Sequence, residues 1–125
     1  MISNKLSGKL ALIVEDDPVS NELLNYLLKK VEMKTLRALS GSEAMKLFID
    51  NPDIDIVLMD IKMPDLNGFE VTKLMKKIRP NIPIIAQTAY ALSGDRQRAL
   101  AEGCDEYIKK PIKKEVLFEL MEKFF

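Results

Sequence analysis

Short apolar runs alternate with amphipathic stretches along the whole chain of 125 residues. Five of these runs predict buried or half-buried strands, because they are short, bounded by turn residues and rich in branched side chains. The predicted strands cover residues 9–15, 33–38, 54–60, 82–88 and 105–111. The second is the most polar, which favours a place near the edge of a sheet.

The stretches between the runs repeat apolar residues at helical spacing and predict five helices. Their expected ranges are 18–31, 41–51, 68–79, 93–103 and 113–124. Asp17 is the expected N-cap of the first, with Pro18 in its first turn. Capping boxes begin at Ser40 and Asn67, and Gly103 is the expected C-cap of the fourth.

Strands that alternate with helices indicate an α/β fold, in which a doubly wound, five-stranded parallel sheet carries helices on both faces. We expect one domain over residues 9–125, preceded by an N-terminal extension or linker at residues 1–8. In such folds, ligands bind beyond the carboxyl ends of the strands. The residues at those ends are therefore the first candidates for a functional site.

Charge and composition restrict the function further. Nineteen basic and nineteen acidic residues cancel, so we expect no direct contact with nucleic acid or with a membrane. The longest apolar run, from Leu10 to Val14, is far too short to span a bilayer. The single cysteine, Cys104, suits a reducing compartment and predicts a cytoplasmic location.

The chain contains no histidine, so any chemistry must use carboxylates, hydroxyls, lysines or a metal ion that prefers oxygen. Such groups follow four of the predicted strands. They are Glu15 and Asp16, Asp60, Thr88, and Lys110. Clustered carboxylates repel one another unless a cation intervenes, and oxygen donors favour Mg²⁺, with Mn²⁺ as the alternative. The set predicts phosphoryl transfer in which Asp60 is the nucleophile and forms an acyl phosphate.

Four segments, "LIVEDDP", "VLMDIKMPDLNG", "IIAQTA" and "YIKKPI", resemble in order the receiver domains of two-component response regulators. The resemblance implies a flavodoxin-like sheet with strand order 2-1-3-4-5. It makes Asp60 the phosphoacceptor and Asp16 a direct ligand of Mg²⁺. Glu15 would act nearby, and Lys62 would lend its backbone carbonyl to the metal. Asp17 is expected to cap the first helix.

The same resemblance assigns the residues that respond to phosphorylation. Thr88 would follow the phosphoryl oxygen, Lys110 would pair with it, and Tyr107 would be the aromatic residue that moves on activation. The Lys110–Pro111 bond is a candidate cis peptide. The output face would comprise the segment after Thr88 with the last strand and helix, and Tyr90 is one residue expected to influence phosphoryl lifetime.

The predicted donor is a phosphohistidine on another protein, either a histidine kinase or a histidine phosphotransfer domain. Residues 87–112 resemble receivers of hybrid sensor histidine kinases in particular. The main interpretation is thus the C-terminal receiver of such a kinase, at the cytosolic end of a membrane-anchored protein. The alternative is a stand-alone response regulator. Either would be a monomer or a weak homodimer through the last helix and strands.

Two other classes of function are open at this point. A hydrolase that turns over an aspartyl phosphate typically has a second aspartate two residues after the nucleophile, where this chain has Lys62. A flavodoxin-like or purely structural interaction module is the other, although an inert module would have little use for the acidic set. We therefore expect no enzyme activity beyond self-phosphorylation and autodephosphorylation.

Overall fold

A computed structural model describes residues 5–63, 65, 67–88 and 94–125. Ten elements alternate along this chain, as the sequence pattern predicts. In order they are β1 (Leu10–Val14), α1 (Pro18–Lys30), β2 (Lys34–Ala38), α2 (Gly41–Asp50), β3 (Ile56–Asp60), α3 (Gly68–Ile78), β4 (Ile84–Thr88), α4 (Asp95–Ala101), β5 (Glu106–Lys109) and α5 (Lys114–Glu122).

All neighbouring strands are parallel, and their order in the sheet is β2-β1-β3-β4-β5. The predicted fold class and strand order are therefore confirmed. The chain reverses its direction of winding between β1 and β3, so the carboxyl ends of these two neighbours flank the switch point of the sheet. The polar second strand lies at an edge, where solvent reaches part of it.

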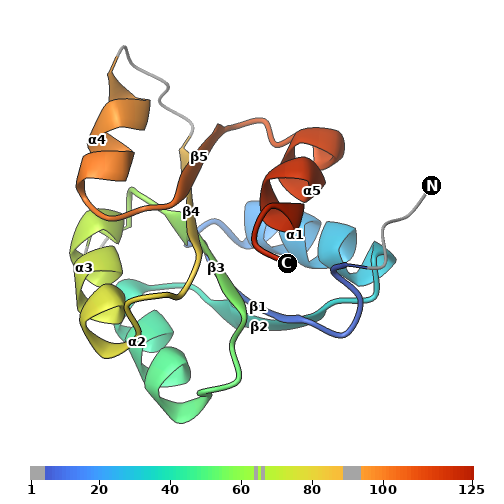
Figure 1. The fold of residues 1–125 in the computed structure, drawn as a ribbon, viewed down its shortest axis with the longest axis horizontal. Helices are drawn as coiled ribbons and strands as arrows, with labels where there is room; N and C mark the ends of the chain where they lie inside the picture. Colours follow the sequence, from blue (N-terminus) through green and yellow to red (C-terminus); the bar gives the residue numbers. More distant parts are fainter. Residues whose placement is uncertain (1–4, 64, 66, 89–93) are drawn as a thin grey trace.

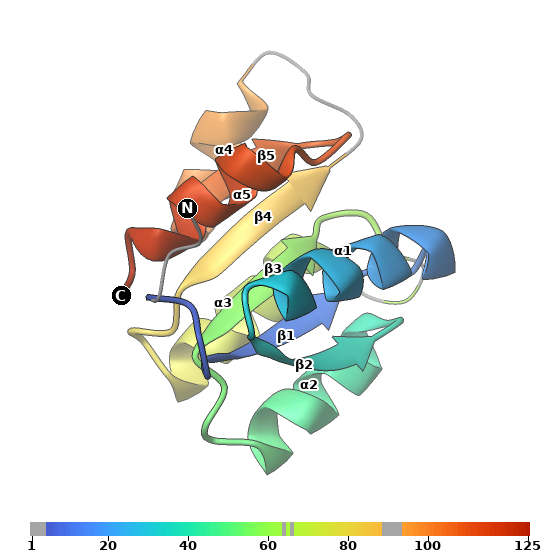
Figure 2. The same cartoon turned by 90° about the vertical axis from the view of Figure 1, so that its right-hand side faces the viewer.

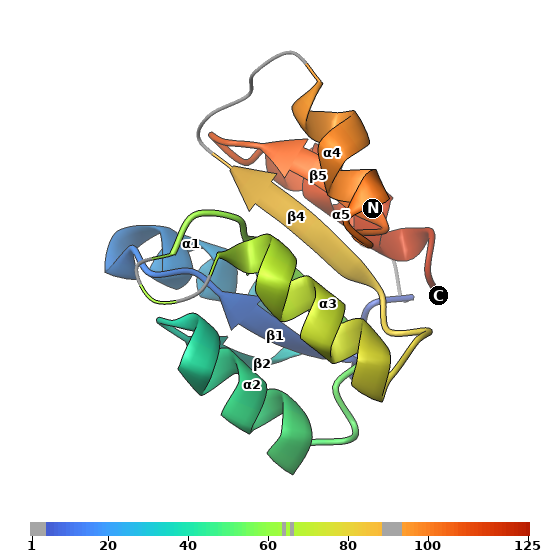
Figure 3. The same ribbon diagram turned by 90° about the vertical axis from the view of Figure 1, so that its left-hand side faces the viewer.

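The helices form two layers, one on each face of the sheet (Figure 1). Figure 3 shows α2, α3 and α4 over one face, and Figure 2 shows α1 and α5 over the other. Each layer of helices packs against the sheet and forms an apolar core with it. Phe48 and Met75 are central to the first core, and Leu28 and Met121 to the second.

The predicted caps lie at the beginnings of their helices. The Asp17 carboxylate accepts from Ser20 N at 3.2 Å, and Ser40 and Asn67 accept from the backbone N–H three residues on at 3.1 Å and 3.0 Å. All five strands begin one or two residues later than predicted. The delay is two residues for β3 and β4, where Asp55 N donates to Leu10 O at 2.8 Å and Pro83 O accepts from Val57 N at 2.9 Å. Helix α4 is shorter than expected, and its predicted start at residue 93 lies outside the described residues.

The predicted extension packs onto the domain where the structure describes it, at residues 5–8. Leu6 is fully buried within the second core, and Gly8 N donates to Glu32 O at 2.9 Å. Within the described ranges, no helix has both the length and the apolar character that crossing a membrane would require.

Candidate metal and phosphoryl site

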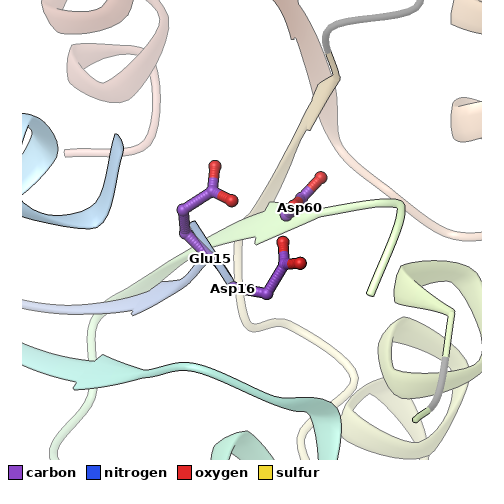
Figure 4. A group of neighbouring side chains, drawn as sticks. All are labelled: Glu15, Asp16 and Asp60. Atoms are coloured by element: carbon purple, nitrogen blue, oxygen red, sulfur yellow. The ribbon is translucent and has the colours of Figure 1, made fainter. Parts of the chain in front are cut away.

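Three carboxylates meet at the carboxyl ends of two neighbouring strands (Figure 4). Glu15 and Asp16 follow β1, and Asp60 is the last residue of its neighbour β3. One carboxylate oxygen from each of the three lies within 4.8 Å of those of the other two. Glu15 and Asp60 are 1% and 5% exposed, whereas Asp16 faces solvent. The fold thus gathers two buried acids and one exposed acid around one point.

A lysine from the far side of the rim enters this group. Lys110, just after β5, forms an ion pair with the buried Glu15, whose other oxygen accepts from Asp17 N at 3.1 Å. If all four groups are ionised, three carboxylates and one ammonium leave two negative charges on the site. That charge would be balanced by a divalent cation.

Asp60 is the acid that this arrangement perturbs most. The pKa of its carboxyl is raised to about 8, chiefly by burial and then by the neighbouring Glu15 and Asp16, while Lys110 acts in the opposite direction. One oxygen of Asp60 accepts from Lys62 N at 3.2 Å. The carboxylate is thus held in place by a backbone N–H, yet its charge is poorly stabilised by the protein alone.

The donor set fits a hard divalent cation. Carboxylate oxygens are the ligands that Mg²⁺ prefers, and Mg²⁺ usually keeps several waters, which the exposed Asp16 side of the cluster would admit. The only described cysteine is buried among apolar side chains, and the chain has no histidine, so the site offers nothing that zinc would favour. The cluster is compatible with Mg²⁺.

The remaining predicted residues lie on the strands beyond Asp60. Thr88 is buried at the end of β4, next to β3, and its carbonyl accepts from Lys110 N at 2.8 Å. Tyr107 lies one strand further away, half-buried against the first core, and its enclosed hydroxyl has no hydrogen-bond partner in the described part of the chain. The Lys110–Pro111 peptide bond is cis. Tyr90 and the segment directly after Thr88 lie outside the described residues.

One residue that supports the site was not predicted from the sequence. Gly68, the first residue of α3, packs against the strand end so closely that a Cβ would collide with the carbonyl oxygen of Asp60 and come within 2.7 Å of Ile61 Cα. Its N–H donates to Ile61 O at 2.7 Å. The glycine after the Asn67 cap was the only signal in the sequence. It allows α3 to begin directly against the backbone of Asp60.

The structure also shows a second overlooked residue, Asp65, in the loop between β3 and α3. Its carboxylate accepts from Gly41 N and Ser42 N, each at 3.0 Å, and from the Ser42 hydroxyl at 2.6 Å. The loop that follows Asp60 is thereby attached to the start of α2. A polar loop residue carries no sequence signal for such a contact.

Comparison with known proteins agrees with this geometry. Residues 11–122 match the model of the response regulator receiver domain. The polar-differentiation response regulator DivK of Brucella ovis is 41% identical over 107 residues, which cover 83% of this chain and 85% of that protein. The response regulator TrrA of Thermotoga maritima, solved with Mg²⁺ and a beryllium fluoride, is 33% identical with a TM-score of 0.85, covering 94% of this chain and 99% of that one.

A third neighbour shows the fold alone, because it is only 24% identical. It is the receiver domain of Saccharomyces cerevisiae Ssk1, solved together with the histidine phosphotransfer protein Ypd1, with a TM-score of 0.86 and coverage of 95% of this chain and 90% of that one. The family match spans most of the chain, and DivK is 41% identical over 107 residues. The chain belongs to the response regulator receiver domain family.

Proposed function

We propose that this receiver domain accepts a phosphoryl group on Asp60, in the presence of Mg²⁺, from a phosphohistidine on another protein. The observation that carries the proposal is the buried position of Asp60 at a strand end, with Glu15 and Asp16 within 4.8 Å and Lys110 joined to the same group. A carboxylate buried in this way lowers the stability of the fold unless a cation or hydrogen bonds compensate its charge.

Glu15, Asp16 and Asp60 are the proposed metal-binding side chains, and the backbone carbonyl of Lys62 is the fourth protein group. Mg²⁺ supplies positive charge for the oxygens of the transferring phosphoryl group. Mn²⁺, which accepts the same oxygen ligands, is the proposed substitute. TrrA, at 33% identity, is a relative solved with Mg²⁺ and a beryllium fluoride, which supports this part of the proposal.

In the proposed reaction, a carboxylate oxygen of Asp60 attacks the phosphorus of phosphohistidine. A P–O bond forms, the P–N bond breaks, and the imidazole nitrogen leaves with the electron pair of that bond. Lys110, which lies beside Glu15 before the reaction, is the proposed partner of a phosphoryl oxygen. Because the chain itself has no histidine, the donor is a separate protein or domain.

The phosphoryl group adds about −1.5 to −2 charge and strong acceptor oxygens at the end of β3. Hydrogen bonds to such a group contribute roughly 1.5–3 kcal/mol each. Shifting the equilibrium between the inactive and active conformations from about 1:99 to 99:1 needs about 5.5 kcal/mol. Contacts of the phosphoryl group with Lys110 and the Thr88 hydroxyl would supply most of this free energy. Movement of Tyr107 is the proposed readout, since its enclosed hydroxyl has no partner in this state.

We further propose that the chain acts as a stand-alone response regulator rather than as the receiver of a hybrid kinase, which was the main interpretation of the sequence. The support comes from DivK, a response regulator of which the matched region already covers 85%. The proposed partner is a histidine kinase or a histidine phosphotransfer protein. The Ssk1 receiver, a neighbour in fold, was solved with a partner of the latter kind.

Asp60→Asn tests the proposal. We expect the wild-type chain to incorporate phosphate from acetyl phosphate or a phosphorylated phosphotransfer domain when Mg²⁺ is present, and the variant to incorporate none. Retarded migration on a phosphate-affinity gel measures the product. Asp53→Asn, which alters an exposed aspartate away from the acidic cluster, is the matched control and should label like wild type. Wild-type labelling of Asp60→Asn would refute the assignment.

A further inference from the structure

A pocket of about 390 Å³ opens on the face of the sheet covered by α1 and α5. Figure 2 shows these two helices over that face, with β4 visible between them. Ser20, Leu23 and Leu24 of α1 line one side, Lys110 and Ile112 the other, and Gln87 of β4 also lines it. The volume lies within the range of pockets that hold small organic molecules, about 300–1,000 Å³.

Gln87 is the anomaly of this pocket. It occupies a position on an otherwise apolar strand that faces the same side as Ile85, in the second core. The residue is 1% exposed, and among the described residues neither the oxygen nor the nitrogen of its side-chain amide has a hydrogen-bond partner. Buried polar groups are nearly always paired, so an amide with both ends unpaired requires an explanation.

The other polar groups of the pocket are already engaged. Lys110 is paired with Glu15, and the Ser20 hydroxyl donates to Asp17 at 2.7 Å. Around this pocket, within the described part of the chain, the Gln87 amide is thus the polar group that is left to recognise a ligand. An amide presents a donor and an acceptor side by side, and the charge of Lys110 is already balanced. This combination favours a neutral ligand over an anionic one.

We propose that the pocket binds a small, neutral, planar molecule that carries an amide-type edge. The Gln87 amide, which has no hydrogen bond to break, turns toward the pocket, and the neighbouring N–H and C=O groups of the ligand pair with its two ends. The apolar body of the ligand packs against Leu23, Leu24 and Ile112. The site adjoins the acidic cluster through Lys110 but uses none of the carboxylates. Binding therefore requires neither phosphorylation nor Mg²⁺, and it is distinct from the proposed function.

Benzamide is a suitable probe, and methyl benzoate, which keeps the ring and a carbonyl but has no N–H, is its control. We expect benzamide to shift the NMR signals of the Gln87 side-chain amide and of the Leu23 and Leu24 methyls with millimolar affinity, as is typical of so small a ligand. Methyl benzoate should bind about fivefold more weakly, because it leaves the Gln87 oxygen unpaired.

Gln87→Met keeps the length of the side chain and removes its amide. We expect this variant to bind benzamide about tenfold more weakly and to lose the preference over methyl benzoate. Asp53→Asn, which alters an exposed side chain away from the pocket, should keep wild-type affinity within about twofold. The proposal is overturned if benzamide leaves the pocket signals unmoved at about 20 mM, or if Gln87→Met binds it as tightly as wild type. Water alone would then be the partner of the amide.

Discussion

Removal of the charge on Asp60 should stabilise the metal-free protein. The substitution Asp60→Asn preserves the shape of the side chain and deletes one of three charges whose oxygens lie within 4.8 Å. Two unit charges at that separation repel by about 3.5 kcal/mol at an effective dielectric constant of about 20. Because Lys110 offsets the charge of Glu15, roughly one such repulsion remains, and solvent around the exposed Asp16 weakens it.

At or above about pH 8, where Asp60 ionises, we therefore expect Asp60→Asn to raise the free energy of unfolding by at least about 2 kcal/mol, or the Tm by at least about 8 °C for a domain of this size. The gain should depend on pH. The pKa of Asp60 is raised from 3.8 to about 8 in the folded chain, so its ionisation costs nothing below pH 3.8 and progressively more up to about pH 8. Wild-type stability should fall across that window, and that of the variant should fall less.

Thermal unfolding in a chelator, at about pH 5 and about pH 8, measures this difference. Saturating Mg²⁺ should then stabilise wild type at about pH 8 and have much less effect on the variant, because a cation relieves the same repulsion. Asp53→Asn serves as the control for the loss of an exposed aspartate. If Asp60→Asn is no more stable than wild type in the chelator, and Mg²⁺ shifts both equally, the electrostatic account of the site is wrong.

Three further predictions concern groups around the site and in the core. Gly68→Ala should lower the free energy of unfolding by about 2–3 kcal/mol and slow phosphate uptake, since its Cβ would collide with the Asp60 carbonyl; unchanged urea unfolding would contradict this. Lys110→Met should lower the free energy of unfolding by about 2 kcal/mol, because it leaves the buried Glu15 without its cation. Equal denaturation midpoints for the variant and wild type would argue against the ion pair. Burial raises the pKa of the Cys104 thiol to about 11, so a thiol reagent at neutral pH should label the native protein at least about a hundredfold more slowly than the urea-unfolded chain; comparable rates would refute its burial.

Much of the fold and of the site followed from local sequence patterns. The branched apolar run before Asp60 and the capping residues Asp17, Ser40 and Asn67 depend on neighbours within a few positions, so the sequence predicted them. Once strands alternate with helices, the parallel sheet brings strand ends to one rim. That rule was enough to place Glu15 and Asp60 together.

The tertiary structure decided the contacts between residues that are far apart along the chain. The pairing of Lys110 with Glu15, the collision that only glycine avoids at position 68, and the burial of Leu6 all depend on how separate elements pack. The unpaired amide of Gln87 belongs to the same class. In the sequence it is a single polar letter in an apolar strand, and only the packing of α1 and β4 determines whether that amide finds a partner. Sequence patterns report local preference, whereas desolvation and charge pairing depend on the complete three-dimensional neighbourhood.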